Sequence, residues 1–203
     1  MPAELAVPLV PRAPVAAPLH GALRAAHLGR GDLAGTRPAH AVRNLFVENA
    51  TRVVLVRDRR PSMALGPSWS PWLCNPYACG TVGRLLAASA RRARCVFREE
   101  DDQLAHALEA LAIGRLGRGS FAFLVSDFLM LPSEDIWREA LERGWDIVPV
   151  VLQSSVWRGP QISDLFDRLG LDPIRIARHD DMSIWRAFYR WSEARLAGVR
   201  ACA

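Results

Sequence analysis

Residues 121–152 read FAFLVSDFLMLPSEDIWREALERGWDIVPVVL. The first six residues form an unbroken apolar run, which is typical of a strand buried on both faces of a sheet. Pro132 and Ser133 are suited to open a helix, and acidic residues follow them in its first turn. A second apolar run, at 146–152, comes next, and Pro149 inside it predicts a bend or a position without a ladder partner. The stretch therefore predicts a strand, a helix and a second strand.

The same alternation extends on both sides of this unit. Further strands are predicted at 52–57, 95–97 and 174–177, and further helices at 81–93 (with Thr81 as its cap), 103–115 and 181–196. The segment 41–47 is expected to pair with 52–57 as a hairpin. Strands alternating with helices of about a dozen residues predict an α/β fold, in which a mostly parallel central sheet is covered by helices on both faces.

The length and composition of the chain limit how many domains it can form. The chain has 203 residues, of which 50% are hydrophobic and 23% charged, which suits one domain with an added segment. Residues 1–40 are rich in Pro, Ala and Gly and are interpreted as an N-terminal extension, whereas 41–203 form the domain. No apolar run approaches the roughly 20 residues that a membrane span needs. Glu4 and several prolines argue against a signal peptide, so a cytoplasmic location is predicted.

The charge balance raises one alternative function. All 26 basic residues are arginine, and they give a net charge of +5, so the chain could be a basic nucleic-acid-binding protein. However, the arginines are spread along the chain, and the clearest cluster, at 91–98, is followed directly by four acids at 99–102. These acids are interpreted as a solvated cluster whose charges compensate one another. The pattern does not indicate a stripe that follows phosphates.

Two smaller motifs have structural interpretations. Cys74 and Cys79 are separated by four residues without a nearby histidine, which is a poor zinc pattern. Free thiols are favoured, and a bond between the two stays an alternative because the intervening Asn-Pro-Tyr-Ala could turn. The run His179-Asp180-Asp181 is interpreted as a loop that caps the last helix.

Carboxylates follow the predicted strands at the points where the strands end. Asp58 follows the strand at 52–57, Asp127 follows the strand at 121–126, and the acids at 99–102 precede a helix. In a parallel sheet these positions converge on one rim. Several carboxylates on one rim repel one another unless a positive group is bound there, and Mg²⁺ is one such group.

The residues around this rim resemble a known family. The segment VVLVRDRRPSMALG at 53–66 is similar to the first strand of von Willebrand factor A-like domains, whose metal-ion-dependent adhesion site begins Asp-x-Ser-x-Ser. More narrowly, the Ser-Met ending, FLVSDFL at 123–129 and GWDIVPVVL at 144–152 resemble the bacterial domain-of-unknown-function family numbered 58, over about residues 42–178. The resemblance implies a three-layer, Rossmann-like von Willebrand factor A-type fold.

Carried over to this sequence, the resemblance implies a degenerate metal site made of Asp58, Ser62, Asp102 and Asp127. Asp58 and Ser62 match the first and last residues of the motif, and Asp127 matches the acid after the central strand. Asp102 is the nearest equivalent of a loop threonine that is missing here. The middle serine of the motif is replaced by Arg60.

An arginine at this position changes the electrostatics of the rim. Two unit charges about 4 Å apart interact by roughly 4 kcal/mol at an effective dielectric constant near 20, and the repulsion roughly doubles against a dication. Arg60 could therefore expel Mg²⁺ and bind Asp58 or Asp127 itself. Alternatively, Arg60 could turn into solvent and leave a weakened metal site. No cofactor is expected, and Mg²⁺ is the alternative.

The expected function is a non-enzymatic protein-interaction module. The resemblance implies a partnership with a MoxR-type AAA+ ATPase in chaperone-like assembly or maturation. Independently of the resemblance, Arg60 is expected to pair with an acidic group of a partner, and Trp69 and Trp72, in a loop near the rim, are expected as further partner-binding residues. An Asp-dependent Mg²⁺ phosphohydrolase would need a second acid two positions after Asp58, where Arg60 stands, and a lysine that the chain lacks. Neither a GxGxxG motif after a strand nor a GxxxxGK[ST] loop occurs, which argues against nucleotide binding.

Overall fold

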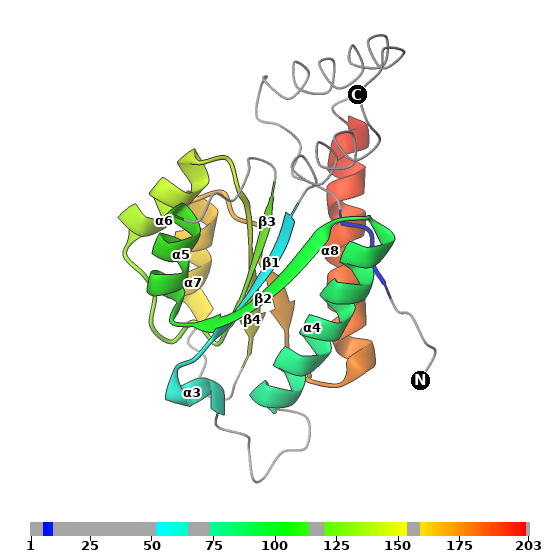
Figure 1. The fold of residues 1–203 in the computed structure, drawn as a ribbon, viewed down its shortest axis with the longest axis horizontal. Coiled ribbons are helices and arrows are strands. Elements are labelled where there is room, and N and C mark those ends of the chain that lie inside the picture. Colours follow the sequence, from blue (N-terminus) through cyan, green and yellow to red (C-terminus); the bar gives the residue numbers. More distant parts are fainter. Residues whose placement is uncertain (1–5, 10–51, 65–73, 114–119, 154–158, 202–203) are drawn as a thin grey trace, which may run out of the picture.

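The computed structural model of the chain describes residues 6–9, 52–64, 74–113, 120–153 and 159–201. Five parallel strands form one sheet in the order β2-β1-β3-β4-β5 (Figure 1). Their bounds are Arg52–Asp58 (β1), Val96–Asp102 (β2), Phe121–Ser126 (β3), Asp146–Leu152 (β4) and Ile174–Ile176 (β5). The predicted α/β fold with a parallel central sheet is confirmed.

Helices cover both faces of the sheet. The helices are α3 (Pro61–Ala64), α4 (Asn75–Arg92), α5 (Leu104–Ile113), α6 (Glu134–Glu142), α7 (Gly159–Arg168) and α8 (Asp181–Ala201). Figure 1 shows α5, α6 and α7 on one face and α4 and α8 on the other. Among the described helices, none combines the length and the apolar character that crossing a membrane requires.

The strands divide their side chains between two hydrophobic cores, one on each face. In β1, Val53 and Leu55 pack with residues of α4 and α8, whereas Val54 and Val56 pack with residues of α5, α6 and α7. Successive side chains of a strand point to opposite faces, so a strand covered on both faces needs a continuous apolar run. All residues of β3 and β4 are buried, which confirms the interpretation of 121–126 and 146–152.

Pro149 and Gly144 take positions that suit their backbone chemistry. β5 pairs with β4 only from Val150 to Leu152, so Pro149 has a strand partner on one side only, as its missing N–H predicts. Gly144, two residues after the end of α6, has a φ of 78°, a left-handed conformation that glycine adopts without strain.

Two of the predicted boundaries and one predicted strand pairing were wrong. β2 extends through the acidic run to Asp102, and α4 begins at Asn75 with a proline in its first turn, so Thr81 lies inside the helix. Both edges of β1 are occupied by β2 and β3. No edge is left for an antiparallel hairpin partner, and the segment 41–47 itself lies outside the described residues.

Part of the predicted N-terminal extension packs on the domain. Val7 is 1% exposed and belongs to the core between the sheet, α4 and α8. Its backbone N–H donates to Ser89 Oγ at 3.0 Å, and Ser192 Oγ donates to the carbonyl of Pro8 at 2.9 Å. Residues 6–9 therefore bridge α4 and α8, although they precede β1 by more than forty residues in the sequence.

Candidate functional site at the carboxyl end of the sheet

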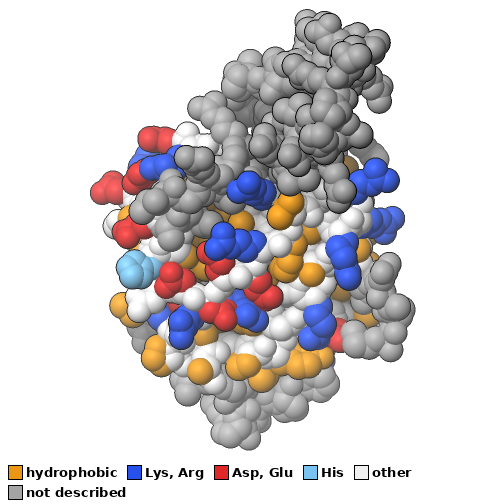
Figure 2. Space-filling view, in the orientation of Figure 1, with side chains coloured by type: hydrophobic (Ala, Val, Ile, Leu, Met, Phe, Trp, Pro, Cys, Tyr) orange, Lys and Arg blue, Asp and Glu red, His pale blue; other side chains and the backbone are white. Residues whose placement is uncertain are grey.

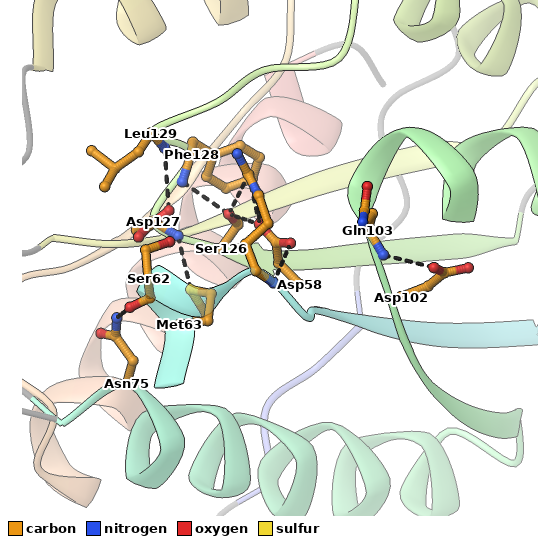
Figure 3. Close-up of polar contacts among 11 residues, drawn as sticks. Asp58, Ser62, Met63, Asn75, Asp102, Gln103, Ser126, Asp127, Phe128 and Leu129 are labelled. Carbon is orange, nitrogen blue, oxygen red and sulfur yellow. Dashed lines mark hydrogen bonds and ion pairs between the residues drawn. The ribbon is translucent and has the colours of Figure 1, made fainter. Parts of the chain in front are cut away.

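The carboxyl ends of β1 and β3 lie side by side and carry the polar residues of the candidate site (Figure 3). Asp58 is the last residue of β1, and Ser126 is the last residue of β3. Asp127 follows directly, and the short helix α3 begins three residues after Asp58. Because the strands are parallel, these positions meet at the carboxyl end of the sheet, as predicted.

Asp58 accepts four hydrogen bonds in a buried position. Arg60 donates to Asp58 Oδ2 from Nε at 2.8 Å and from Nη2 at 2.6 Å, and its backbone N–H donates to Oδ1 at 3.2 Å. Ser126 Oγ donates to the same Oδ2 at 2.6 Å. The side chain of Asp58 is 0% exposed and that of Arg60 is 15% exposed. The contact expected between Arg60 and Asp58 is thus present, and it is a charge-assisted pair.

Ser126 connects this pair to the loop after β3. Its hydroxyl accepts a hydrogen bond from the backbone N–H of Phe128 at 2.9 Å and lies 3.4 Å from Arg60 Nη2. Phe128 has a φ of 52°. This left-handed conformation is rare and unfavourable for a bulky residue, so the contacts around Phe128 must compensate for it. Its ring is buried against Trp137 and Phe166. The loop after β3 is therefore fixed by one hydroxyl group and by aromatic packing.

Asp127 is buried beside this network, and its carboxylate bonds within its own loop whereas its backbone N–H bonds to α3. Its Oδ1 accepts the backbone N–H of Leu129 at 3.2 Å, and its own N–H donates to Met63 Sδ at 3.3 Å. Ser62, next to Met63 in α3, uses its carbonyl to accept a hydrogen bond from Asn75 Nδ2 at 3.2 Å. Asp58, Ser62 and Asp127 are thus brought to the same end of the sheet (Figure 3).

Asp102 takes a different role from the other three predicted ligands. It is paired in register with Asp58, but its Oδ1 accepts the backbone N–H of Gln103 at 2.7 Å and lies 3.8 Å from His106 Nδ1. Figure 3 shows its carboxylate next to Gln103 at the start of α5, apart from the group around Asp58. Asp102 therefore acts at the N-terminus of α5, where a negative charge is favoured.

The described donor set does not fit a divalent cation. The guanidinium of Arg60 stands 2.6 Å from Asp58 Oδ2, which is the place where a cation would have to bind. Asp102 is turned toward α5, and the described residues contain no group of three or more His, Cys, Asp or Glu side chains in a metal-binding arrangement. Mg²⁺ requires oxygen ligands from carboxylates, hydroxyls or water around it, and a guanidinium supplies none.

The acidic run of β2 is compensated by arginines, as the sequence predicted. Arg57 contacts Glu99 at 3.2 Å and Asp101 at 2.6 Å, and Arg98 contacts Glu100 at 2.7 Å. Figure 2 shows basic and acidic side chains intermixed on this face of the molecule. Among the described residues of β2 and its neighbours, the basic side chains are therefore paired with acidic ones and do not form a positive stripe.

An exposed apolar loop beside the site was missed by the sequence analysis. Leu129, Met130 and Leu131 are 43%, 70% and 36% exposed and directly follow the buried residues Asp127 and Phe128. Loops between a strand and a helix are normally polar, so this LML sequence was a signal that could have been found. Trp69 and Trp72, predicted as partner contacts, lie outside the described residues.

The predicted cysteine and histidine roles are also resolved by the structure. Cys74 and Cys79 are free thiols, and burial raises the pKa of Cys79 to about 12. Asp180 accepts the backbone N–H of Ser183 at 2.9 Å and so caps α8, as predicted. His179 is 2% exposed, and burial lowers its pKa below the ordinary value.

Comparison with protein-family models gives no match to the chain, and comparison with curated proteins gives none either.

Proposed function

We propose that the chain is a non-enzymatic protein-interaction module of von Willebrand factor A type. It works in the cytoplasm with a MoxR-type AAA+ ATPase in the assembly or maturation of other proteins. The observation that supports this proposal most directly is the pairing of Asp58 with Arg60. The side chain of Asp58 is 0% exposed and accepts hydrogen bonds from Arg60 and from Ser126, which argues against a nucleophile or a general base, because both roles need contact with a substrate.

The partner-binding surface is the rim that this pair stabilises. Leu129, Met130 and Leu131 present apolar side chains to solvent, and exposed apolar groups rimmed by polar residues are typical of interaction sites. Arg60 contacts Ser126, three residues before Leu129, and the Nη1 atom of Arg60 has no hydrogen-bond partner in the part of the chain that the structure describes. A carboxylate of the partner could bind there, and Trp69 and Trp72 would extend the contact.

Binding at this rim is independent of metal. In metal-bearing domains of the wider class, a cation bridges the domain to an acidic side chain of the partner. Here the guanidinium of Arg60 carries the positive charge instead. An acidic partner residue therefore needs no cation to be attracted to the rim.

The test is capture of a purified MoxR-type AAA+ ATPase from the same source by the full chain, with Mg²⁺ or with a chelator. We expect equal capture under both conditions. The variant Met130→Asp should reduce capture by about tenfold or more, because it places a charge at the centre of the apolar contact. Met182→Asp, the same change on the exposed surface of α8, is the matched control and should capture the ATPase like the wild type.

Three results would overturn the proposal. A strict requirement for Mg²⁺ would contradict metal-independent binding. If the Met130→Asp and Met182→Asp variants captured the ATPase equally, the rim would not be part of the interface. Turnover of a phosphoester that is lost in an Asp58→Asn variant would show that the module is an enzyme.

A further inference from the structure

A concave surface lies between β5 and α8, and none of the residues that line it belongs to the rim around Asp58. It is a groove of about 560 Å³, and the residues that line it come from the segment 172–178 and from one face of α8. Four of these lining residues are arginines and one is an aspartate: Arg175, Arg178, Arg186, Arg190 and Asp172. The excess of positive charge in this groove contrasts with the balanced charges of β2.

The charges of the groove are only partly compensated. Asp172 accepts a hydrogen bond from Arg195, which is outside the lining, at 3.3 Å. Arg178 contacts Asp180 at 3.4 Å. Arg186 and Arg190 are exposed, and neither contacts a carboxylate within the described residues. The groove therefore presents at least two guanidinium groups to an incoming anion.

The placement of these two arginines opposes helix stability. Arg186 and Arg190 are four residues apart on α8, so their side chains are neighbours on one helix face. Like charges at this spacing destabilise a helix, and Arg175 of the adjacent strand lines the same groove. An anionic ligand would relieve this repulsion.

The floor of the groove is apolar. Ile174 and Trp191 belong to the hydrophobic core, and Ala187 packs against it. Trp191 is not a free stacking platform, because it is only 7% exposed. The guanidinium of Arg195 lies 4.4 Å from its ring centroid, and Phe123 contacts it edge-on. Nucleic-acid bases need an open aromatic face for stacking, so this floor suits an aliphatic side chain better.

From this combination we infer that the groove between β5 and α8 binds an acidic segment of a partner protein. An aliphatic side chain of the segment fills the apolar floor, and its carboxylates pair with Arg186 and Arg190. Charge complementarity sets the class of ligand, and the concave floor requires an apolar anchor. This surface is separate from the rim around Asp58, so it does not depend on the proposed function.

The test uses the full chain and a fluorescent peptide of alternating Glu and Leu, with binding followed by anisotropy at low and moderate salt. Two control peptides replace Glu by Gln or Leu by Ser. We expect the Glu-Leu peptide to bind at least about tenfold more tightly than either control, because charge and anchor both contribute. Binding should weaken as salt increases.

Variants locate the peptide on the molecule. The pair Arg186→Gln and Arg190→Gln should weaken binding by about tenfold or more. The pair Arg91→Gln and Arg92→Gln removes the same charge from the exposed end of α4 and should have less than about a twofold effect. Ala177→Trp, at an exposed position lining the groove, should block the anchor without changing charge. The double variant of Arg186 and Arg190 should melt at the same temperature as the wild type or higher, and this measurement would confirm that the variant is folded.

Several outcomes would overturn the inference. One is the absence of peptide binding. Another is a loss of peptide binding in the double variant of Arg91 and Arg92 that equals the loss in the double variant of Arg186 and Arg190, because this would show only an effect of net charge. If the Glu-Ser peptide bound as tightly as the Glu-Leu peptide, binding would not need an apolar anchor. Tighter binding of a single-stranded oligonucleotide, lost in the double variant of Arg186 and Arg190, would assign the groove to nucleic acid instead.

Discussion

The two ends of the sheet each hold a buried arginine–aspartate pair, but the pairs are built differently. At the carboxyl end, Arg60 contacts Asp58 only two residues away in the sequence, and its side chain is 15% exposed. At the amino end, Arg195 of α8 contacts Asp146, the first residue of β4, at 2.6 Å across 49 positions, and its side chain is 4% exposed. The first pair arranges one loop, and the second ties a helix to the sheet.

The residues around the two arginines also differ between the two ends of the sheet. Arg195 also contacts Asp172 and lies over the ring of Trp191, so its guanidinium is held by two carboxylates and by an aromatic face. Arg60 is held by Asp58 and lies close to Ser126, near the exposed loop at 129–131. We conclude that the amino-end pair ties α8 to the sheet, whereas the carboxyl-end pair sets the charge of the rim that we propose as a partner-binding surface.

The largest expected effect comes from breaking the amino-end pair. Arg195→Met should lower the free energy of unfolding by about 3–5 kcal/mol, because it leaves the carboxylate of Asp146 buried without its cation. Urea denaturation measures the change. The double variant Arg195→Met with Asp146→Leu should regain most of the loss, since no buried charge remains. A single variant that loses less than about 1 kcal/mol would contradict the stabilising role of this pair.

Breaking the carboxyl-end pair should cost less. Arg60→Ser is expected to lower the free energy of unfolding by roughly 2 kcal/mol, because Ser126 still donates to Asp58 and loss of the partly exposed Arg60 side chain opens Asp58 to water. Arg59→Ser, at the exposed neighbouring position, serves as the control and should change stability by less than about 0.5 kcal/mol. If Arg60→Ser destabilised the protein as much as Arg195→Met, the two pairs would be equivalent.

A smaller effect is expected for the hydroxyl that links Asp58 to the loop after β3. Ser126→Ala removes one donor to Asp58 and the acceptor of the Phe128 N–H, and it should cost about 1–2 kcal/mol. Ser126→Cys keeps a weak donor and acceptor and should cost less than the alanine variant. Thermal unfolding of both variants separates them, and an unchanged melting temperature in Ser126→Ala would show that Phe128 is fixed by packing alone.

The smallest effect is a dependence on pH near the carboxyl end. Burial lowers the pKa of His179 below its ordinary value of 6.5, so the unfolded chain binds a proton at a higher pH than the folded chain. Stability should therefore decrease as the pH falls through 6.5 toward the lowered pKa, and it should be recovered above 6.5. His179→Phe should show a flatter profile in denaturation series at pH values between about 5 and 7.5. An identical slope in both proteins would assign the pH dependence to other groups.

The sequence predicted the central elements because their burial leaves a clear pattern. The apolar runs at 121–126 and 146–152 are typical of strands in a sheet covered on both faces, and every residue of both strands is buried. β2 was predicted too short because VFREEDD lacks strand propensity. It forms a strand through pairing with β1 and through the contacts of Arg57 with Glu99 and Asp101, which is tertiary context that propensity does not contain.

The candidate site was predictable in its position but not in all of its contacts. Strand order places Asp58 and Asp127 at one end of the sheet. The charge of Arg60 allowed pairing with Asp58 or Asp127 or a turn into solvent, and the structure shows the pairing with Asp58. The orientation of the Asp102 side chain toward α5 comes from its hydrogen bond with the backbone N–H of Gln103, a contact that the predicted helix at 103–115 does not specify. Arg195 was missed, although it continues the buried stripe of Ile184, Phe188 and Trp191 on α8. An arginine on such a stripe requires a buried partner.

Calorimetric titration with Mg²⁺ of the wild type and of the Arg60→Ser variant tests most directly whether a guanidinium replaces a cation at the rim. We predict no heat of binding in the wild type. In Arg60→Ser we predict binding at one site, which a further Asp58→Asn change should abolish. Stoichiometric binding in the wild type that is lost on Asp58→Asn alone would contradict the account, because Asp58 would then hold a metal despite the presence of Arg60.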